Sequence, residues 1–160
     1  MNTKLNLSML LIVLSTFFSF SASANSSILL TLSDANGFTR TFTKQDLEAL
    51  PQETITTTTP WTKGSNTYEG PKLSAVVNLA PKPFDSFTTY ALNDYSYTIT
   101  KEDLKHYQFI LAMKENGKEM NIRNNGPLWI LIPFSEHPGI KRGDEILNML
   151  VWQLTRIEIN

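Results

Sequence analysis

Apolar and polar residues alternate along much of the chain, and turn-forming residues separate the alternating runs. Because successive side chains of a strand point to opposite faces, such runs predict β-strands. Two segments differ: residues 54–59 are β-branched throughout, and residues 128–132 are apolar throughout, which is typical of a strand buried on both faces. The predicted strands cover residues 27–32, 38–42, 54–59, 87–92, 96–99, 109–113, 120–122, 128–132 and 151–159.

Short helices are predicted between these strands. Thr43–Leu47 and Thr100–Leu104 each follow a predicted strand and begin with a threonine that has an acidic residue three positions on. This variant of the capping box starts a short helix, and the first such helix should end before Pro51. Residues 70–79 fit a third helix with proline in its first turn. The sequence therefore predicts an α+β domain, a β-rich mixed sheet or barrel with short helices.

The N-terminal residues form an export signal by their pattern. Lys4 precedes an apolar run at residues 9–20, and Ala22-Ser23-Ala24 has the small-residue pattern of a signal-peptidase site. We therefore expect residues 1–24 to be a signal peptide and residues 25–160 to be a single domain in the periplasm. The chain has no cysteine, so no disulfide can stabilise the domain in that oxidising compartment.

Composition excludes several classes of function. The chain has 14 basic and 15 acidic residues and a formal net charge of −1, which does not suit nucleic acid binding by bulk charge. It has two histidines, 31 positions apart and without cysteines, which makes a zinc site a poor expectation. A Gly-x-Ser-x-Gly elbow and a Walker phosphate loop are both absent from the sequence.

One polar corner has the character of a cofactor-site loop. Asn124-Asn125-Gly126-Pro127 leads into the apolar strand at residues 128–132, and Trp61-Thr62-Lys63-Gly64 forms a second corner upstream. Asparagine and glycine tolerate left-handed backbone, and their amides can recognise the edge of a flat ligand. Such corners also serve as plain turns, and the local sequence leaves both interpretations open.

The order of these pieces resembles the sulfite-oxidase-type molybdopterin-binding domain. The resemblance runs from the Trp61–Gly64 corner and the Gly70-Pro71 helix start, through Asn93-Asp94-Tyr95 and the hairpin of residues 110–118, to the closing strand at residues 152–159. It covers about residues 31–159 and implies a β-rich fold with a groove for a pterin cofactor. The chain is also similar to small periplasmic proteins of the PruR type. That similarity implies pterin binding and regulation of a membrane-bound partner with diguanylate cyclase and phosphodiesterase domains.

The resemblance also indicates where this chain departs from the enzymes of the family. Those enzymes hold molybdenum through a cysteine thiolate near the position of residues 56–61, where this chain has threonines, proline and tryptophan. Threonine hydroxyls are poor replacements for a soft thiolate ligand. We therefore expect no molybdenum and no catalysis, and we expect a pterin as the ligand.

The candidate ligand-binding residues lie at three corners. A pterin needs a ring to stack on and both donors and acceptors at its edge, so Trp61 is the candidate for stacking and Asp94 for accepting two hydrogens. Arg123 could donate to the pterin carbonyl or to a phosphate. The full set is Thr59, Trp61, Asn93, Asp94, Tyr95, Arg123, Asn125 and Gly126. Each has a structural alternative: a core tryptophan for Trp61, a solvated charge for Arg123 and ordinary turns for the rest. Trp129 and Trp152 are expected in the core.

Three interpretations follow from these observations. The first is a non-catalytic periplasmic pterin-binding protein that regulates a membrane signalling enzyme through its periplasmic sensor domain. The second is a molybdopterin-dependent oxidoreductase subunit that lacks the cysteine ligand. The third is a fold without a ligand that serves only as a protein-interaction module. Pterin and metal content distinguish the three.

Overall fold

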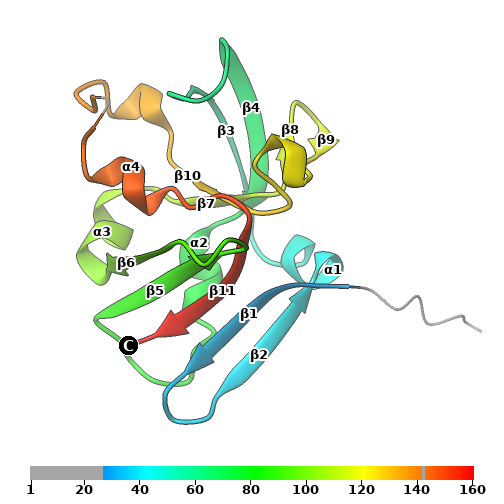
Figure 1. Cartoon of the computed structure of the whole chain (residues 1–160), viewed down its shortest axis with the longest axis vertical. Coiled ribbons are helices and arrows are strands. Elements are labelled where there is room, and N and C mark those ends of the chain that lie inside the picture. The colour runs from blue at the N-terminus through cyan, green and yellow to red at the C-terminus, as the bar shows by residue number, and fades with distance from the viewer. Residues whose placement is uncertain (1–26, 142) are drawn as a thin grey trace, which may run out of the picture.

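The computed structural model describes residues 27–141 and 143–160, so the predicted signal peptide lies outside the described residues. A five-stranded sheet forms the lower half of the molecule in Figure 1, with the strand order β2-β1-β11-β5-β6. Its strands are β1 (Ile28–Asp34), β2 (Thr39–Thr43), β5 (Ser86–Ala91), β6 (Ser96–Thr100) and β11 (Leu154–Ile159). The β1–β11 pair is parallel and the others are antiparallel. The C-terminal strand β11 lies in the middle of the sheet.

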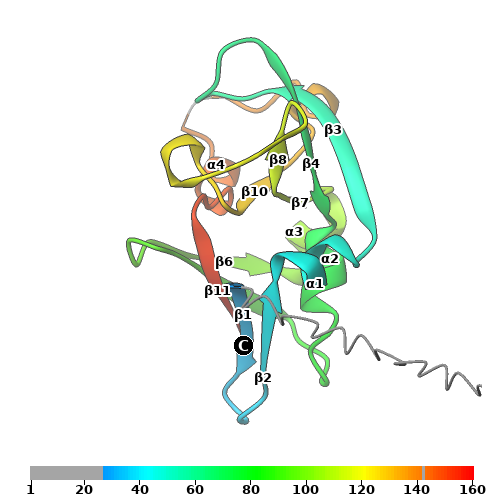
Figure 2. The ribbon, with the colours of Figure 1, turned by 90° about the vertical axis from the view of Figure 1, so that its right-hand side faces the viewer.

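A second sheet forms the upper half, with the order β3-β4-β8-β9. Its strands are β3 (Gln52–Thr58), β4 (Ser65–Pro71), β8 (Lys114–Glu115) and β9 (Lys118–Glu119), and a separate pair joins β7 (Ile110–Ala112) to β10 (Trp129–Leu131). Gly70 lets β4 cross against β7, because a Cβ at Gly70 would lie 1.9 Å from the carbonyl oxygen of Leu111. Figure 2 shows β3 at the outer margin of this upper sheet.

Short helices connect the strands. They are α1 (Lys44–Glu48), α2 (Leu73–Val77), α3 (Lys101–His106) and α4 (Ile146–Met149), with 3-10 turns η1 (Ile122–Asn124) and η2 (Phe134–Glu136). Both predicted capping boxes are confirmed: the hydroxyl of Thr43 accepts from the N–H of Asp46, and Thr100 does the same for Asp103. Among the described residues, no helix is long and apolar enough to cross a membrane.

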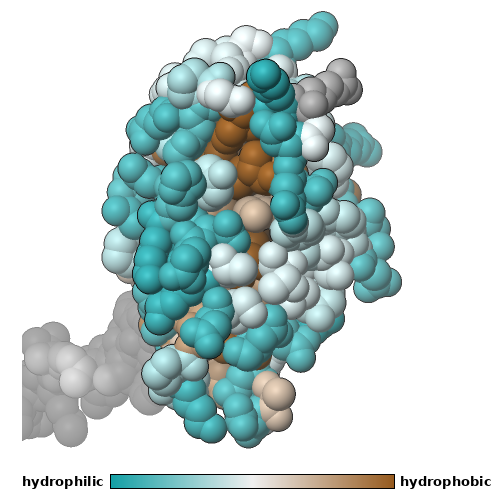
Figure 3. Space-filling view, turned by 90° about the vertical axis from the view of Figure 1, so that its left-hand side faces the viewer, coloured by the Kyte–Doolittle hydropathy of each residue, from teal (hydrophilic) through white to brown (hydrophobic). Residues whose placement is uncertain are grey.

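The core consists of two adjoining clusters. The larger one is built from strands of the lower sheet, α2 and β10, and includes Phe42, Phe87 and Leu154. The smaller one lies inside the upper sheet and includes Tyr68 and Trp129. The core is not fully covered, because a narrow strip of hydrophobic residues shows between hydrophilic rims on the left-hand side of the molecule (Figure 3).

Some of the predicted elements differ from the structure in extent or type. Residues 70–79 were expected to be one helix, but β4 continues to Pro71 and α2 covers only Leu73–Val77. The reason is pairing, because β4 is hydrogen-bonded to β3 along its whole length. Residues 120–122 were expected to be a strand, but η1 begins at Ile122, because the side chain of Asn121 accepts the N–H of Arg123 and caps a turn instead.

Candidate functional site

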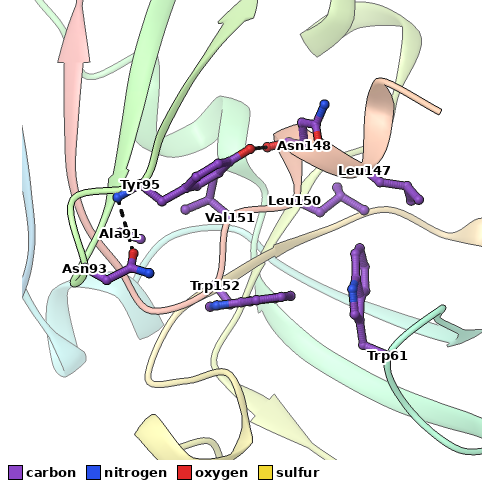
Figure 4. Close-up of a pocket in the computed structure, with 9 residues that line it drawn as sticks. All are labelled: Trp61, Ala91, Asn93, Tyr95, Leu147, Asn148, Leu150, Val151 and Trp152. Carbon is purple, nitrogen blue, oxygen red and sulfur yellow. Dashed lines mark hydrogen bonds between the residues drawn. The ribbon is translucent and has the colours of Figure 1, made fainter. Parts of the chain in front are cut away.

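A pocket of about 330 Å³ lies where the β3–β4 loop, the β5–β6 hairpin and α4 meet (Figure 4). Its size is at the lower end of the range for small-molecule sites, which is roughly 300–1,000 Å³. Three aromatic side chains and two asparagines surround an aliphatic wall. The lining residues are Trp61, Ala91, Asn93, Tyr95, Leu147, Asn148, Leu150, Val151 and Trp152.

Trp61 stands in the loop between β3 and β4, and 39% of its surface is exposed. The loop is held by Thr59, whose hydroxyl accepts the N–H groups of Trp61 at 3.2 Å and Thr62 at 3.1 Å and pairs with the hydroxyl of Thr62 at 2.7 Å. Thr59 is itself buried and is not part of the pocket lining. Thr59 therefore positions Trp61, whereas the sequence suggested that both would contact the ligand.

Three tryptophans form a cluster at the pocket. The ring of Trp61 meets those of Trp129 at 5.8 Å and Trp152 at 5.6 Å, both edge to face. Trp129 is fully buried, and its indole N–H donates to the carbonyl of Leu150, so its predicted core position is confirmed. The indoles of Trp61 and Trp152 approach the pocket from different sides (Figure 4), which gives a flat ligand two aromatic surfaces.

The prediction that Trp152 belongs to the core is wrong. Trp152 is 36% exposed and lines the pocket. The alternating pattern of residues 151–159 predicted one continuous strand, but Gln153 has a positive φ of 52° and β11 begins only at Leu154. This interruption ends the alternation of inward and outward side chains, so the side chain of Trp152 need not point to the core face of β11.

The β5–β6 hairpin contributes two of its three candidate residues. Asn93 and Tyr95 line the pocket, whereas Asp94 sits at the exposed tip of the turn with φ 63° and is not among the lining residues. The phenol of Tyr95 donates to the carbonyl of Asn148 in α4 at 3.1 Å, which joins the hairpin to the helix across the pocket wall (Figure 4). Partial burial raises the pKa of Tyr95, so its phenol keeps the proton it donates.

The third predicted corner lies outside the pocket lining. Arg123 is exposed, and Asn125 has a left-handed backbone with φ 67°, as its sequence suggested. Its carbonyl accepts the N–H of Gln153 at 3.0 Å, while the N–H of Gly126 donates to the carbonyl of Asn121 at 2.8 Å. This corner therefore supports the backbone just after Trp152, and direct contact of Arg123, Asn125 or Gly126 with a ligand stays a prediction.

The contribution of α4 was not predictable from the sequence. Leu147, Asn148 and Leu150 line the pocket, but residues 142–150 carried no recognisable pattern, because α4 is only four residues long and has no side-chain cap.

The structure also brings the two histidines together, with ring centroids of His106 and His137 6.2 Å apart. Within residues 27–141 and 143–160, no three His, Cys, Asp or Glu side chains are placed to hold a metal ion.

The electrostatic character of the pocket is neutral. None of its nine described lining residues carries a charge, and the polar groups are the amides of Asn93 and Asn148 and the phenol of Tyr95. Such a lining can stack against an aromatic ring and offer donors and acceptors to its edge. It contains no cation that would compensate a phosphate.

Comparison with known proteins adds the class of fold. No family model matches the chain, and no curated protein matches it. Similarity to a solved structure confirms the strand-rich α+β fold expected from the sequence and supports its sulfite-oxidase-like type. That structure is the sulfane dehydrogenase SoxCD from Paracoccus pantotrophus, with a TM-score of 0.61 and 20% sequence identity. The match covers 81% of this chain but only 37% of that chain. At this identity the likeness shows the fold alone.

Proposed function

We propose that this chain is a non-catalytic pterin-binding protein of the periplasm that regulates a membrane signalling enzyme. The observation that carries the proposal is the neutral pocket between Trp61, Trp152 and Tyr95. A pterin is a flat bicycle with a guanidine-like edge, so it needs aromatic surfaces and amide groups in one place. The pocket provides the rings of three aromatic residues and the amides of Asn93 and Asn148.

The absence of charge favours a pterin without a phosphate. Molybdopterin carries a dithiolene, which holds the metal, and a phosphate, which proteins bind with arginine, lysine or backbone amides. The pocket lining has no such cation, and the chain has no cysteine to provide the thiolate ligand of the family's enzymes. These two features weigh against the molybdopterin-dependent oxidoreductase subunit and favour a neutral ligand.

The regulatory part of the proposal rests on the resemblance to PruR-type proteins. The pocket has a form that suits such a role, because α4 and the β5–β6 hairpin, which expose Asn148 and Tyr95, make up most of its wall. They are joined by Tyr95 to Asn148 and by Tyr97 to Glu145, and the second hydrogen bond raises the pKa of Tyr97 to about 12. A ligand between these elements changes the surface that a periplasmic sensor domain of the partner would contact.

The first experiment identifies what the protein carries. The mature protein is purified from periplasm, and released small molecules are analysed by mass spectrometry and fluorescence beside metal analysis of the same sample. A pterin without molybdenum is the expected result. Molybdenum in near equal ratio with a dithiolene pterin would overturn the proposal in favour of the oxidoreductase subunit.

Titration calorimetry with neopterin and neopterin monophosphate tests the pocket itself. We expect neopterin to bind more tightly, because the lining offers the phosphate no cation. Trp61→Ala should weaken neopterin binding by about fivefold to 150-fold, since a ring stack is worth about 1–3 kcal/mol, whereas Trp61→Phe should retain most of it. Unchanged affinity in Trp61→Ala would refute the stacking role. No shift of the melting curve by either compound would favour the interaction module.

The regulatory half needs its own measurement. A strain that lacks this protein is complemented with wild type, Trp61→Ala or Trp61→Phe, and cellular cyclic di-GMP is measured. We expect the Trp61→Phe strain to match wild type and the Trp61→Ala strain to match the strain without the protein. Equal cyclic di-GMP levels in strains with and without the protein would refute the signalling role and leave pterin binding in place.

A further inference from the structure

The outer edge of β3 combines three features of a pairing surface. β3 stands at the end of the strand order β3-β4-β8-β9 and at the outer margin of the sheet in Figure 2, with η2 as a described neighbour outside the sheet. It pairs with β4 over all seven residues without a bulge. Its sequence, Gln-Glu-Thr-Ile-Thr-Thr-Thr, contains five β-branched residues and neither lysine nor proline. Natural edge strands usually carry such residues or bulges to block pairing.

The other edges of the two sheets are each protected. β9 is only two residues long, and Glu119 within it is engaged by Lys44. β2 carries the exposed Arg40. β6 is linked to α4 by the hydrogen bond from Tyr97 to Glu145. Of these four sheet edges, β3 is therefore the one with the least protection against pairing.

A pocket adjoins this edge on the inner face of the strand. It has a volume of about 230 Å³, and its apolar lining comes from Ile55, Leu104, Phe109 and Ile110. Ile55 is partly buried and packs against the smaller core cluster. A side chain that arrives from a strand added beside β3 would meet Ile55 and Phe109 there, beside polar side chains such as Lys105, while the backbone edge supplies the hydrogen bonds.

We propose that the occupant is a second copy of this chain, paired antiparallel through β3 about a two-fold axis at Ile55. The strand is self-complementary in this register. Ile55 faces Ile55 of the second copy beside this pocket, Thr54 faces Thr56, and Glu53 faces Thr57. Opposed threonines are already used inside the protein, where Thr56 pairs with Thr67 and Thr88 with Thr98 through hydroxyls 3.0 Å apart.

Charge does not oppose this arrangement. The only charged residue of β3 is Glu53, which is paired with Lys72 at 2.7 Å and meets an uncharged residue of the second copy. A two-fold interface uses the same surface on both copies, so each half of the dimer gains the same backbone pairing and the same apolar contact. The upper sheets of the two copies then form one continuous sheet.

Two double variants that differ at one position test the register. Residues 54 and 56 are exposed on the outer face, so substitutions there leave the core unchanged. Thr54→Lys/Thr56→Lys places like charges opposite each other twice, and Thr54→Lys/Thr56→Glu places opposite charges there. We expect dimer dissociation constants at least about tenfold apart, with the Lys/Glu variant tighter. Light scattering after size exclusion over a concentration series measures them, and circular dichroism checks that both fold.

Cysteine cross-linking provides an independent readout, because the chain has no cysteine of its own. An oxidised mixture of Thr54→Cys and Thr56→Cys chains should form the mixed disulfide faster than either variant forms its own, since only the mixed pair is directly opposed. A wild-type chain that stays monomeric at its highest soluble concentration overturns the proposal. A dimer in which both double variants behave alike, or in which the mixed disulfide is not favoured, overturns it too. None of these outcomes depends on the pterin.

Discussion

Replacing Thr59 with valine removes the hydroxyl that holds the Trp61 loop and leaves the shape of the side chain almost unchanged. In the structure this hydroxyl takes part in three hydrogen bonds, two from the N–H groups of Trp61 and Thr62 and one with the hydroxyl of Thr62. Thr59 is only 8% exposed, so valine leaves these donors next to a methyl group with little access to water. We expect Thr59→Val to destabilise the protein and to loosen Trp61.

The magnitude follows from the number and environment of these donors. Leaving a buried donor without a partner costs about 1–3 kcal/mol. Because Trp61 itself is partly exposed, its N–H can regain some hydration, and we expect a loss of about 1–2 kcal/mol in the free energy of unfolding. For a domain of this size, that loss lowers the melting temperature by about 3–8 °C.

Thermal denaturation of Thr59→Val beside Thr59→Ser measures the effect. Serine retains the hydroxyl and loses only a methyl group, so its melting temperature should stay closer to wild type. Neopterin affinity should fall in Thr59→Val and stay near wild type in Thr59→Ser, because only valine frees the loop that presents Trp61. Equal melting temperatures for the two variants would show that the hydroxyl does not hold the loop, and the reasoning would fail.

Three further predictions concern the wall of the pocket, the crossing of the sheets and a helix cap. Tyr95→Phe removes the phenol that donates to α4, so neopterin should bind up to about tenfold more weakly in calorimetry while the melting temperature hardly moves; unaltered affinity would contradict the role of this contact. Gly70→Ala should abolish soluble expression or lower the melting temperature severely, because the new Cβ would overlap the carbonyl of Leu111, and a stable variant would refute that crossing. The hydrogen bond from Thr43 holds the pKa of Asp46 below its ordinary value of 3.8, so this carboxylate stabilises the fold above that pH and its contribution is lost as the pH falls through the lowered pKa. Asp46→Ala should therefore melt below wild type at pH 7, with a difference that narrows below about pH 3.8; a difference independent of pH would argue against the charged cap.

The sequence predicted best where local chemistry decides the structure. The capping boxes at Thr43 and Thr100 start helices because the side chains of each threonine and of the acid three residues later accept one another's backbone N–H groups. These hydrogen bonds are local and do not depend on the surrounding fold. Residues 70–79 show the opposite case. Pro71 suits the first turn of a helix, but a full ladder of hydrogen bonds with β3 outweighs the helical propensity of so short a segment.

The residues of the pocket could be predicted only where the local sequence marks a corner. Trp61, Asn93 and Tyr95 lie on loops or turns whose sequences mark them as corners, and the structure places all three in one pocket. Trp152 was missed because its flanking pattern alternates like a strand, and only the positive φ of Gln153 breaks it. The residues of α4 were missed because a four-residue helix without a side-chain cap has no sequence pattern that predicts which hairpin it packs against.

The loop at residues 56–61 connects the fold with the proposed function. In the enzymes that the chain resembles, this loop presents a metal-binding cysteine, and here Thr59 near that position accepts two backbone N–H groups and fixes Trp61. A hydroxyl directed at the loop's own backbone is not available to a metal or a ligand, so the loop works through the ring that it presents. That ring completes a pocket without charge. This corner of the fold thus has the chemistry to recognise a neutral aromatic ligand, which is the feature on which the proposed pterin site rests.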